Sequence, residues 1–148
     1  MRQQLPSDQQ LVWEKRRSQG ITSDVIWKLD AYRAALFLLH VARADNRALL
    51  AAYPADDIAR QLIRAAGSTS ANVAEGYSRA TRADRLRFLD YALGSTRECV
   101  TWYEAVRDSV LPDALIEERL QLLMRIRALL LGLIRSFRER KPSIAFDP

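Results

Sequence analysis

Apolar residues recur every three or four positions along four long stretches of the chain, as they do on the buried face of an amphipathic α-helix. The stretches cover residues 25–44, 58–77, 81–110 and 113–140. The connections between them are short, and helices joined by short connections pack as antiparallel neighbours. The pattern therefore predicts an all-α fold, an up-down antiparallel four-helix bundle, over residues 23–141.

Residue types that begin or end helices support three of the predicted boundaries. Ser23 or Asp24 can accept a hydrogen bond from a free backbone N–H at the start of the first helix. Thr81, with Asp84 three residues later, forms a variant of the capping box and predicts the start of the third helix. Gly76 is expected just beyond the end of the second helix, a position that glycine favours.

Residues 1–22 lack the helical pattern and are expected to form a polar N-terminal arm. Pro6 and Gly20 interrupt this segment, and only residues 11–17 could form one or two helical turns. We expect the arm to be poorly ordered or peripheral, with no place in the core. Residues 142–148 begin with a proline and are expected to form a short C-terminal tail.

The fourth stretch carries more apolar residues than one face of a helix can bury inside the bundle. Its core seam is expected to consist of Leu115, Leu122, Ile126, Leu129 and Leu133. The surplus predicts a subunit interface and hence a homo-oligomer. The predicted interface residues are Leu123, Leu130, Leu131, Ile134 and Phe137. The alternative is that the N-terminal arm covers this surface, and we favour the oligomer.

The composition excludes most enzyme and metal-site templates. One cysteine and one histidine rule out an internal disulfide framework, thiolate zinc sites and two-histidine metal motifs. His40 and Cys99 are expected to be structural residues. No apolar run is long enough to span a bilayer, and the first twenty residues do not resemble a signal peptide. We expect a cytoplasmic, non-enzymatic protein without a metal or cofactor.

Charge is unevenly distributed over the predicted bundle. Lysine and arginine total 23 against 18 acidic residues, a net charge of +5. The turn between the second and third helices and the end of the fourth helix should meet at one end, which becomes basic. The predicted phosphate-contacting residues at this end are Arg79, Arg82, Arg85, Arg87, Arg138, Arg140 and Lys141. The opposite end, with Asp45 among its acidic residues, should be mildly negative. A basic end favours phosphate binding, and the alternative is an ordinary solvated surface.

Asn72, Glu75 and Arg79 are spaced so that they share one side of the second helix near its C-terminus. A carboxylate there opposes the helix dipole and favours a nearby cation, which Arg79 can supply. We interpret the three residues as a structural network that holds the turn, with a ligand site as the alternative.

Two segments resemble motifs of one bacterial family. Residues 63–79 (IRAAGSTSANVAEGYSR) and 88–98 (FLDYALGSTRE) are similar to segments of four-helix-bundle proteins first noticed as products of intervening sequences in large-subunit ribosomal RNA genes. The resemblance implies a four-helix bundle that assembles into a ring-like homopentamer, with no enzymatic activity. It also implies kinship with the accessory proteins of diversity-generating retroelements, which bind nucleic acid and a reverse transcriptase.

Two functions follow from these observations. The first is a non-enzymatic, oligomeric nucleic-acid-binding or ribonucleoprotein-associated bundle, with RNA or DNA and a nucleic-acid enzyme as candidate partners. Its arginines would contact the phosphate backbone without reading bases. The second is a protein-interaction scaffold with no nucleic-acid role, which would use the apolar surplus of the fourth helix and the arm.

Overall fold

The computed structural model describes residues 5–139, and every regular element in that range is helical. The elements are α1 (Asp8–Lys15), α2 (Gln19–Thr22), the short 3₁₀ helix η1 (Val25–Lys28), α3 (Asp30–Ala52), α4 (Ile58–Ser78), α5 (Arg82–Ala105) and α6 (Asp113–Glu139). The predicted all-α fold is confirmed. No helix within residues 5–139 is both long and apolar enough to cross a membrane.

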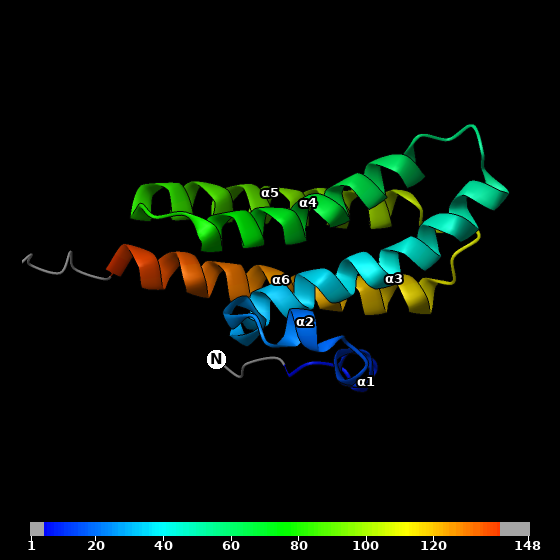
Figure 1. Ribbon diagram of the computed structural model, residues 1–148. Coiled ribbons are helices and arrows are strands. Elements are labelled where there is room, and N and C mark those ends of the chain that lie inside the picture. Colours follow the sequence, from blue (N-terminus) through cyan, green and yellow to red (C-terminus); the bar gives the residue numbers. More distant parts are fainter. Residues whose placement is uncertain (1–4, 140–148) are drawn as a thin grey trace, which may run out of the picture.

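The four long helices form the antiparallel bundle in two layers. Helices α4 and α5 form one layer and α3 and α6 the other, while α1 and α2 lie on the outer side of the α3–α6 layer (Figure 1). Each long helix contacts the next along the chain, and α6 returns to contact α3. The α4–α5 turn and the C-terminal end of α6 therefore lie at one end of the bundle, opposite the α3–α4 and α5–α6 connections (Figure 1).

The predicted first helix differs from the observed one at both ends. Asp24 caps η1 by accepting a hydrogen bond from the backbone N–H of Ile26 at 3.0 Å, and the extended Leu29 separates η1 from α3. Helix α3 then continues to Ala52, past the predicted end near residues 44–46. Asp45, just beyond the predicted end, is buried and hydrogen-bonded inside the bundle.

Close approach of α4 and α5 fixes the turn between them. Gly76 lies inside α4, not beyond its end as predicted, because α4 continues to Ser78. A Cβ atom on Gly76 would lie 3.1 Å from Cβ of Phe88 and 3.3 Å from the carbonyl oxygen of Arg85. The glycine therefore lets α5 pack against the last turns of α4. The predicted cap at the start of α5 is confirmed, since the Asp84 backbone N–H donates to Thr81 Oγ1 at 3.1 Å.

The N-terminal arm contributes to the core, so the expectation that it has no place there was wrong. Trp13 of α1 is only 7% exposed, and its ring centroid lies 5.5 Å from that of Phe37 on α3. Gln10, which is 1% exposed, accepts a hydrogen bond from Arg125 of α6 at 2.8 Å. A single tryptophan in a polar segment carries no helical pattern, so the pattern missed it. The packing partner Phe37 is supplied by α3.

The buried stripe of α6 differs from the predicted seam. It consists of Ile116, Arg119, Leu123, Arg125, Ile126, Leu130 and Ile134. Leu123, Leu130 and Ile134, predicted to form a subunit interface, are therefore core residues of the single chain, and that assignment was wrong for all three. Phe137 is half-buried against the same core, and Leu131 alone among the five is exposed. The arm covers part of the remaining surface, because Leu122 packs against the Trp13 cluster.

Candidate nucleic-acid interface

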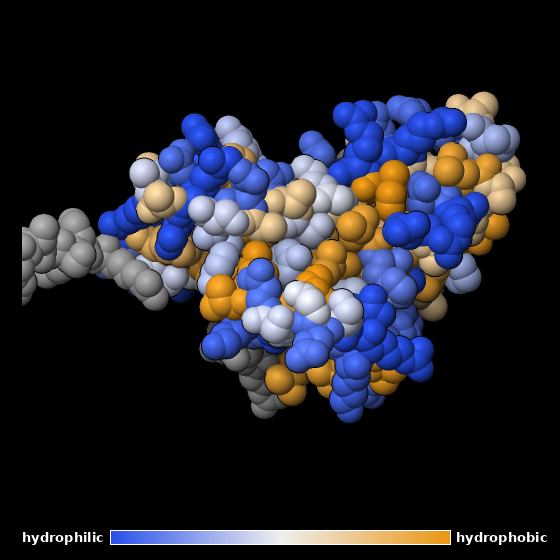
Figure 2. Space-filling model, in the orientation of Figure 1, coloured by the Kyte–Doolittle hydropathy of each residue, from blue (hydrophilic) through white to orange (hydrophobic). Residues whose placement is uncertain are grey.

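Five of the seven predicted phosphate-contacting residues lie at one end of the bundle, and we call this set the basic end. Its members are Arg79, Arg82, Arg85, Arg87 and Arg138. They come from the C-cap of α4, the first two turns of α5 and the last turn of α6. Arg140 and Lys141 lie outside the described residues. Figure 2 shows hydrophilic side chains predominating over the α4–α5 turn, at the upper left of this view.

Hydrogen bonds and ring contacts connect the three segments of the basic end. Arg82 donates a hydrogen bond to the backbone carbonyl of Arg138, which joins α5 to α6. Arg85 donates to the carbonyl of Arg79, and its guanidinium carbon lies 5.8 Å from the ring centroid of Phe137. Arg82 and Arg85 thus also hold the turn in place. Arg79, Arg82, Arg87 and Arg138 are exposed, whereas Arg85 is half-buried.

Two carboxylates at this end pair with arginines of the set. Glu75 forms an ion pair with Arg79 one turn along α4, and Asp84 pairs with Arg87 at 3.0 Å. Both pairs are open to solvent, where an ion pair contributes about 0–1 kcal/mol. A phosphate can therefore replace either carboxylate at little cost.

Asn72 is not part of the predicted Asn72–Glu75–Arg79 network. Its side-chain amide donates to the carbonyl and to the hydroxyl oxygen of Ser68, at 2.9 and 3.0 Å. A short asparagine side chain on a helix reaches the carbonyl one turn back, and Glu75 lies in the other direction. The network thus separates into a Glu75–Arg79 ion pair and an Asn72–Ser68 contact within α4.

Aromatic side chains lie among the arginines of the basic end. These aromatic residues were not among the predicted site residues. Arg79 and Arg87 place their guanidinium carbons 4.8 and 5.5 Å from the ring centroid of Phe88. Tyr91 meets Phe88 edge-to-face, with ring centroids 5.7 Å apart, and is 53% exposed. The signal was present in the sequence as aromatic residues three apart, directly after the arginine-rich turn.

A buried polar cluster connects three helices at the opposite end of the bundle. Arg119 of α6 donates to Asp45 of α3 at 2.8 Å, and the Tyr103 hydroxyl of α5 donates to the same carboxylate at 2.8 Å. Burial, together with the charge of Asp45, raises the pKa of Tyr103 above its usual value. Burial opposes the charge of Arg119, yet its hydrogen bond to Asp45 raises its pKa. Asp45 was predicted among the acidic residues of this end, but it is buried there and its charge is paired with Arg119.

His40 lies beside an aromatic ring of the arm, and Cys99 lies in the core of the bundle. The His40 ring lies 5.7 Å from the ring of Trp13, and partial burial and nearby arginines, Arg17 first among them, lower its pKa. Cys99 is fully buried, and burial raises the pKa of its thiol to about 12. Among the described residues, no group of histidine, cysteine or acidic side chains is arranged to hold a metal ion.

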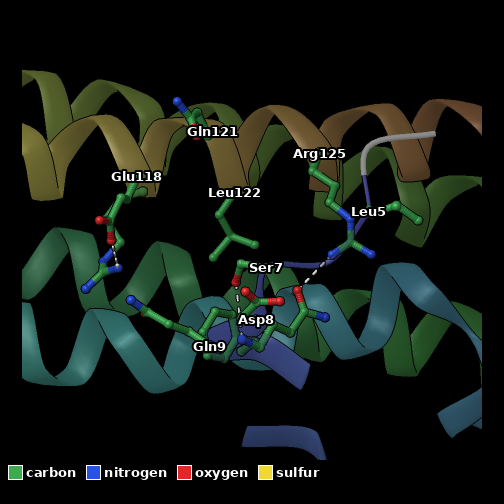
Figure 3. Close-up of a pocket in the computed structure, with 11 residues that line it drawn as sticks. Leu5, Ser7, Asp8, Gln9, Glu118, Gln121, Leu122 and Arg125 are labelled. Atoms are coloured by element: carbon green, nitrogen blue, oxygen red, sulfur yellow. Dashed lines mark hydrogen bonds and ion pairs between the residues drawn. The ribbon is translucent and has the colours of Figure 1, made fainter. Parts of the chain in front are cut away.

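A hollow of about 720 Å³ lies between α1 and α6. Figure 3 shows Arg125 extending from α6 toward the arm, with Leu122 and Ser7 nearby. Arg125 donates a hydrogen bond to Gln10 there, and burial lowers the pKa of the Arg125 guanidinium. The hollow lies where the arm packs against the bundle. The aromatic residues of α5 lie on a different side of the bundle.

Taken together, the fold and the site define an antiparallel four-helix bundle that gathers arginines from three segments at one end. The model of the 23S rRNA-intervening sequence protein family matches residues 42–132, and this chain belongs to that family. The resemblance found in the two sequence segments is thereby confirmed. The kinship with accessory proteins of diversity-generating retroelements stays a prediction.

A solved structure shows the same fold. It is a protein of unknown function from the S23 ribosomal protein family of Bacteroides thetaiotaomicron, with a TM-score of 0.67 and 22% sequence identity. The similarity covers 71% of this chain and 95% of that chain. No curated protein matches this sequence. The arm described above precedes the part of the chain that the family model matches.

Proposed function

We propose that this protein is a non-enzymatic nucleic-acid-binding bundle that contacts the phosphate backbone with its basic end. The convergence of arginines from α4, α5 and α6 at one end carries this proposal. Guanidinium groups bind phosphate oxygens in bidentate geometry and keep their charge at any physiological pH. The basic residues come from three segments, so the bundle fold itself concentrates the charge.

A homo-oligomer would strengthen this function. Several identical basic ends in one particle would bind a polynucleotide through avidity, even where each end binds weakly. Leu131 is 41% exposed on α6, and half-buried Leu120 and Met124 lie on the same side of the helix. We propose that this side of α6, which also carries the exposed Arg127, forms the subunit contact, and the family resemblance supports a pentamer.

The test is equilibrium binding of labelled RNA and DNA, followed by fluorescence anisotropy between 50 and 200 mM salt. Each neutralised phosphate steepens the log–log salt dependence by about 0.9 on duplex DNA or about 0.7 on single strands. A particle that engages about four to six phosphates should lose roughly a hundred- to a thousandfold in affinity over this range.

A charge-matched pair of variants locates the site. Arg87→Glu with Arg138→Glu should abolish binding, because both side chains are exposed at the basic end. Arg60→Glu with Arg64→Glu changes the net charge equally on exposed positions of the first two turns of α4, toward the opposite end, and should preserve most of the affinity. Equal losses in both variants, or salt-insensitive binding, would refute the assignment. The absence of binding to any polynucleotide at 50 mM salt would favour the protein-interaction scaffold.

A further inference from the structure

The outer side of α5 places an open aromatic ring next to guanidinium groups. Arg87 and Tyr91 are four residues apart and therefore neighbours on one face of the helix. Phe88 lies beside both, with Arg79 and Arg87 over its ring and Tyr91 against it at an interplanar angle of 90°. Tyr91, at 53% exposed, keeps much of its surface open to solvent.

We propose that Tyr91 is a stacking platform for a base of single-stranded nucleic acid, with Arg79 and Arg87 contacting the phosphates on either side of that base. This inference rests on the proposed function and specifies its ligand. Proteins that bind single strands without sequence preference combine a basic surface with aromatic rings on which bases stack. The basic end and the Phe88–Tyr91 pair supply these two components side by side.

The chemistry of the surface favours a single strand over a duplex. In a duplex each base face is covered by its neighbours, so an exposed tyrosine on a helix surface finds no ring to stack on. A single strand turns its bases outward, where aromatic rings and guanidinium planes can stack on them. The edge-to-face contact with Phe88 orients the Tyr91 ring before binding, which reduces the ordering cost of the complex.

The surroundings of Tyr91 also favour nucleic acid over a second copy of this chain. Its exposed neighbours on the same face of α5 include Arg87, one turn before it, and Glu98, two turns after it, and both are charged. The centres of protein–protein interfaces are depleted in charged residues, whereas nucleic-acid interfaces are polar and rich in arginine. Opposite-charge pairs such as Asp84–Arg87 remain exchangeable, because they are exposed.

The experiment compares a 20-nucleotide single-stranded RNA with a duplex of the same sequence, using the full chain and anisotropy at 50 mM salt. Tyr91→Ala should weaken single-strand binding by about five- to a hundredfold, the range for losing one base–aromatic stack, and leave duplex binding unchanged. Tyr91→Phe keeps the ring and should bind like the unmodified protein. The matched control is Tyr53→Ala, which removes a tyrosine that is 43% exposed in the α3–α4 connection.

The salt dependence of binding distinguishes the contribution of the Tyr91 ring from that of the arginine charges. Tyr91→Ala should lower affinity at every salt concentration without changing the log–log slope, because tyrosine neutralises no phosphate. Arg87→Gln should flatten the slope on single strands by about 0.7. A single strand carrying 5-iodouracil should photocrosslink to Tyr91 in the unmodified protein, as located by peptide mass spectrometry.

Three results would overturn the inference while leaving nucleic-acid binding itself intact. These are equal losses on single strands and duplexes in Tyr91→Ala, unchanged single-strand affinity in that variant, and crosslinks that fall only outside α5. A Tyr91→Ala protein whose mass falls in light scattering would assign Tyr91 to a contact between copies and overturn the stacking role. Failure of the unmodified protein to bind either probe would instead refute the proposed function, and the inference with it.

Discussion

The buried cluster of Asp45, Arg119 and Tyr103 predicts a large and specific loss of stability on one isosteric change. Asp45→Asn keeps the side-chain shape but removes the negative charge next to Arg119, and the Asp45 and Arg119 side chains are 4% and 10% exposed. Among the described residues, Glu118 would then be the one carboxylate paired with the guanidinium, and it lies 3.8 Å away and is 54% exposed. Breaking a buried pair in this way costs about 3–5 kcal/mol. That is a large fraction of the roughly 5–15 kcal/mol that stabilises a typical domain.

Companion variants show whether the cost comes from the unpaired charge. Tyr103→Phe removes one hydrogen bond to the carboxylate and should cost about 1.5–3 kcal/mol. Asp45→Leu combined with Arg119→Met removes both charges, and apolar replacement of a buried pair is often neutral, so the loss should fall to about that of Tyr103→Phe, because the Tyr103 hydroxyl still loses its acceptor. The double variant should therefore be more stable than Asp45→Asn.

Urea unfolding followed by circular dichroism at 222 nm measures these free energies, at one fixed protomer concentration because assembly shifts apparent stability. The control is Asp57→Asn, which removes an exposed carboxylate 3.9 Å from Arg60 and should cost less than about 0.5 kcal/mol. A loss below about 1 kcal/mol in Asp45→Asn, or a double variant less stable than the single one, would refute the reasoning.

Three further predictions concern packing and reactivity. Gly76→Ala places a methyl group 3.1 Å from α5 and should lower the free energy of unfolding by about 1–3 kcal/mol in the same urea assay. Gly132→Ala adds a methyl group in open space and should raise the free energy of unfolding by roughly 0.5–1 kcal/mol. Leu131→Asp should dissociate the oligomer in light scattering and leave the helical signal unchanged, while Leu130→Asp, at a fully buried position, should unfold the chain. Cys99 should resist alkylation in the native protein at pH 8, because its thiol is buried and, with a pKa of about 12, protonated. The thiol should react once urea unfolds the protein, and rapid labelling of the native protein would contradict this prediction.

The helices could be predicted because their signals are local. The Thr81–Asp84 cap placed the start of α5 correctly, since it depends on residues three positions apart, whereas the predicted end at residue 110 lies beyond the observed end at Ala105. The meeting of the α4–α5 turn with the end of α6 followed from the up-down topology alone. The topology alone therefore predicts that Arg82 and Arg138 lie at one end, where the Arg82 side chain donates a hydrogen bond to the carbonyl of Arg138.

Errors arose where a residue's environment is supplied by a distant part of the chain. Asp45 looks like a helix-ending polar residue, but its partners Tyr103 and Arg119 are 58 and 74 residues away. Trp13 is isolated in a polar segment, and only the folded α3 provides the ring against which it packs. On α6 apolar residues occupy almost every side, so the period left the buried stripe ambiguous, and Leu130 was placed outward by mistake.

The family likeness and the proposed function overlap only in part, since Arg79 and Phe88 lie within the two family-like segments and Arg87 does not. Within the two segments that resemble the family, Ala66, Val73 and Ala92 are fully buried, and Gly76 sets the close approach of α4 and α5. These residues specify how two helices pack, and the packing determines where the turn after α4 projects its arginines. Among the residues that carry the charge and the open ring, Arg87 lies outside both segments, and Tyr91 lies within the second but on the exposed side of α5. Relatives can therefore share this bundle while presenting different chemistry at the same end, so variants at Arg87 and Tyr91 of this chain test its ligand directly.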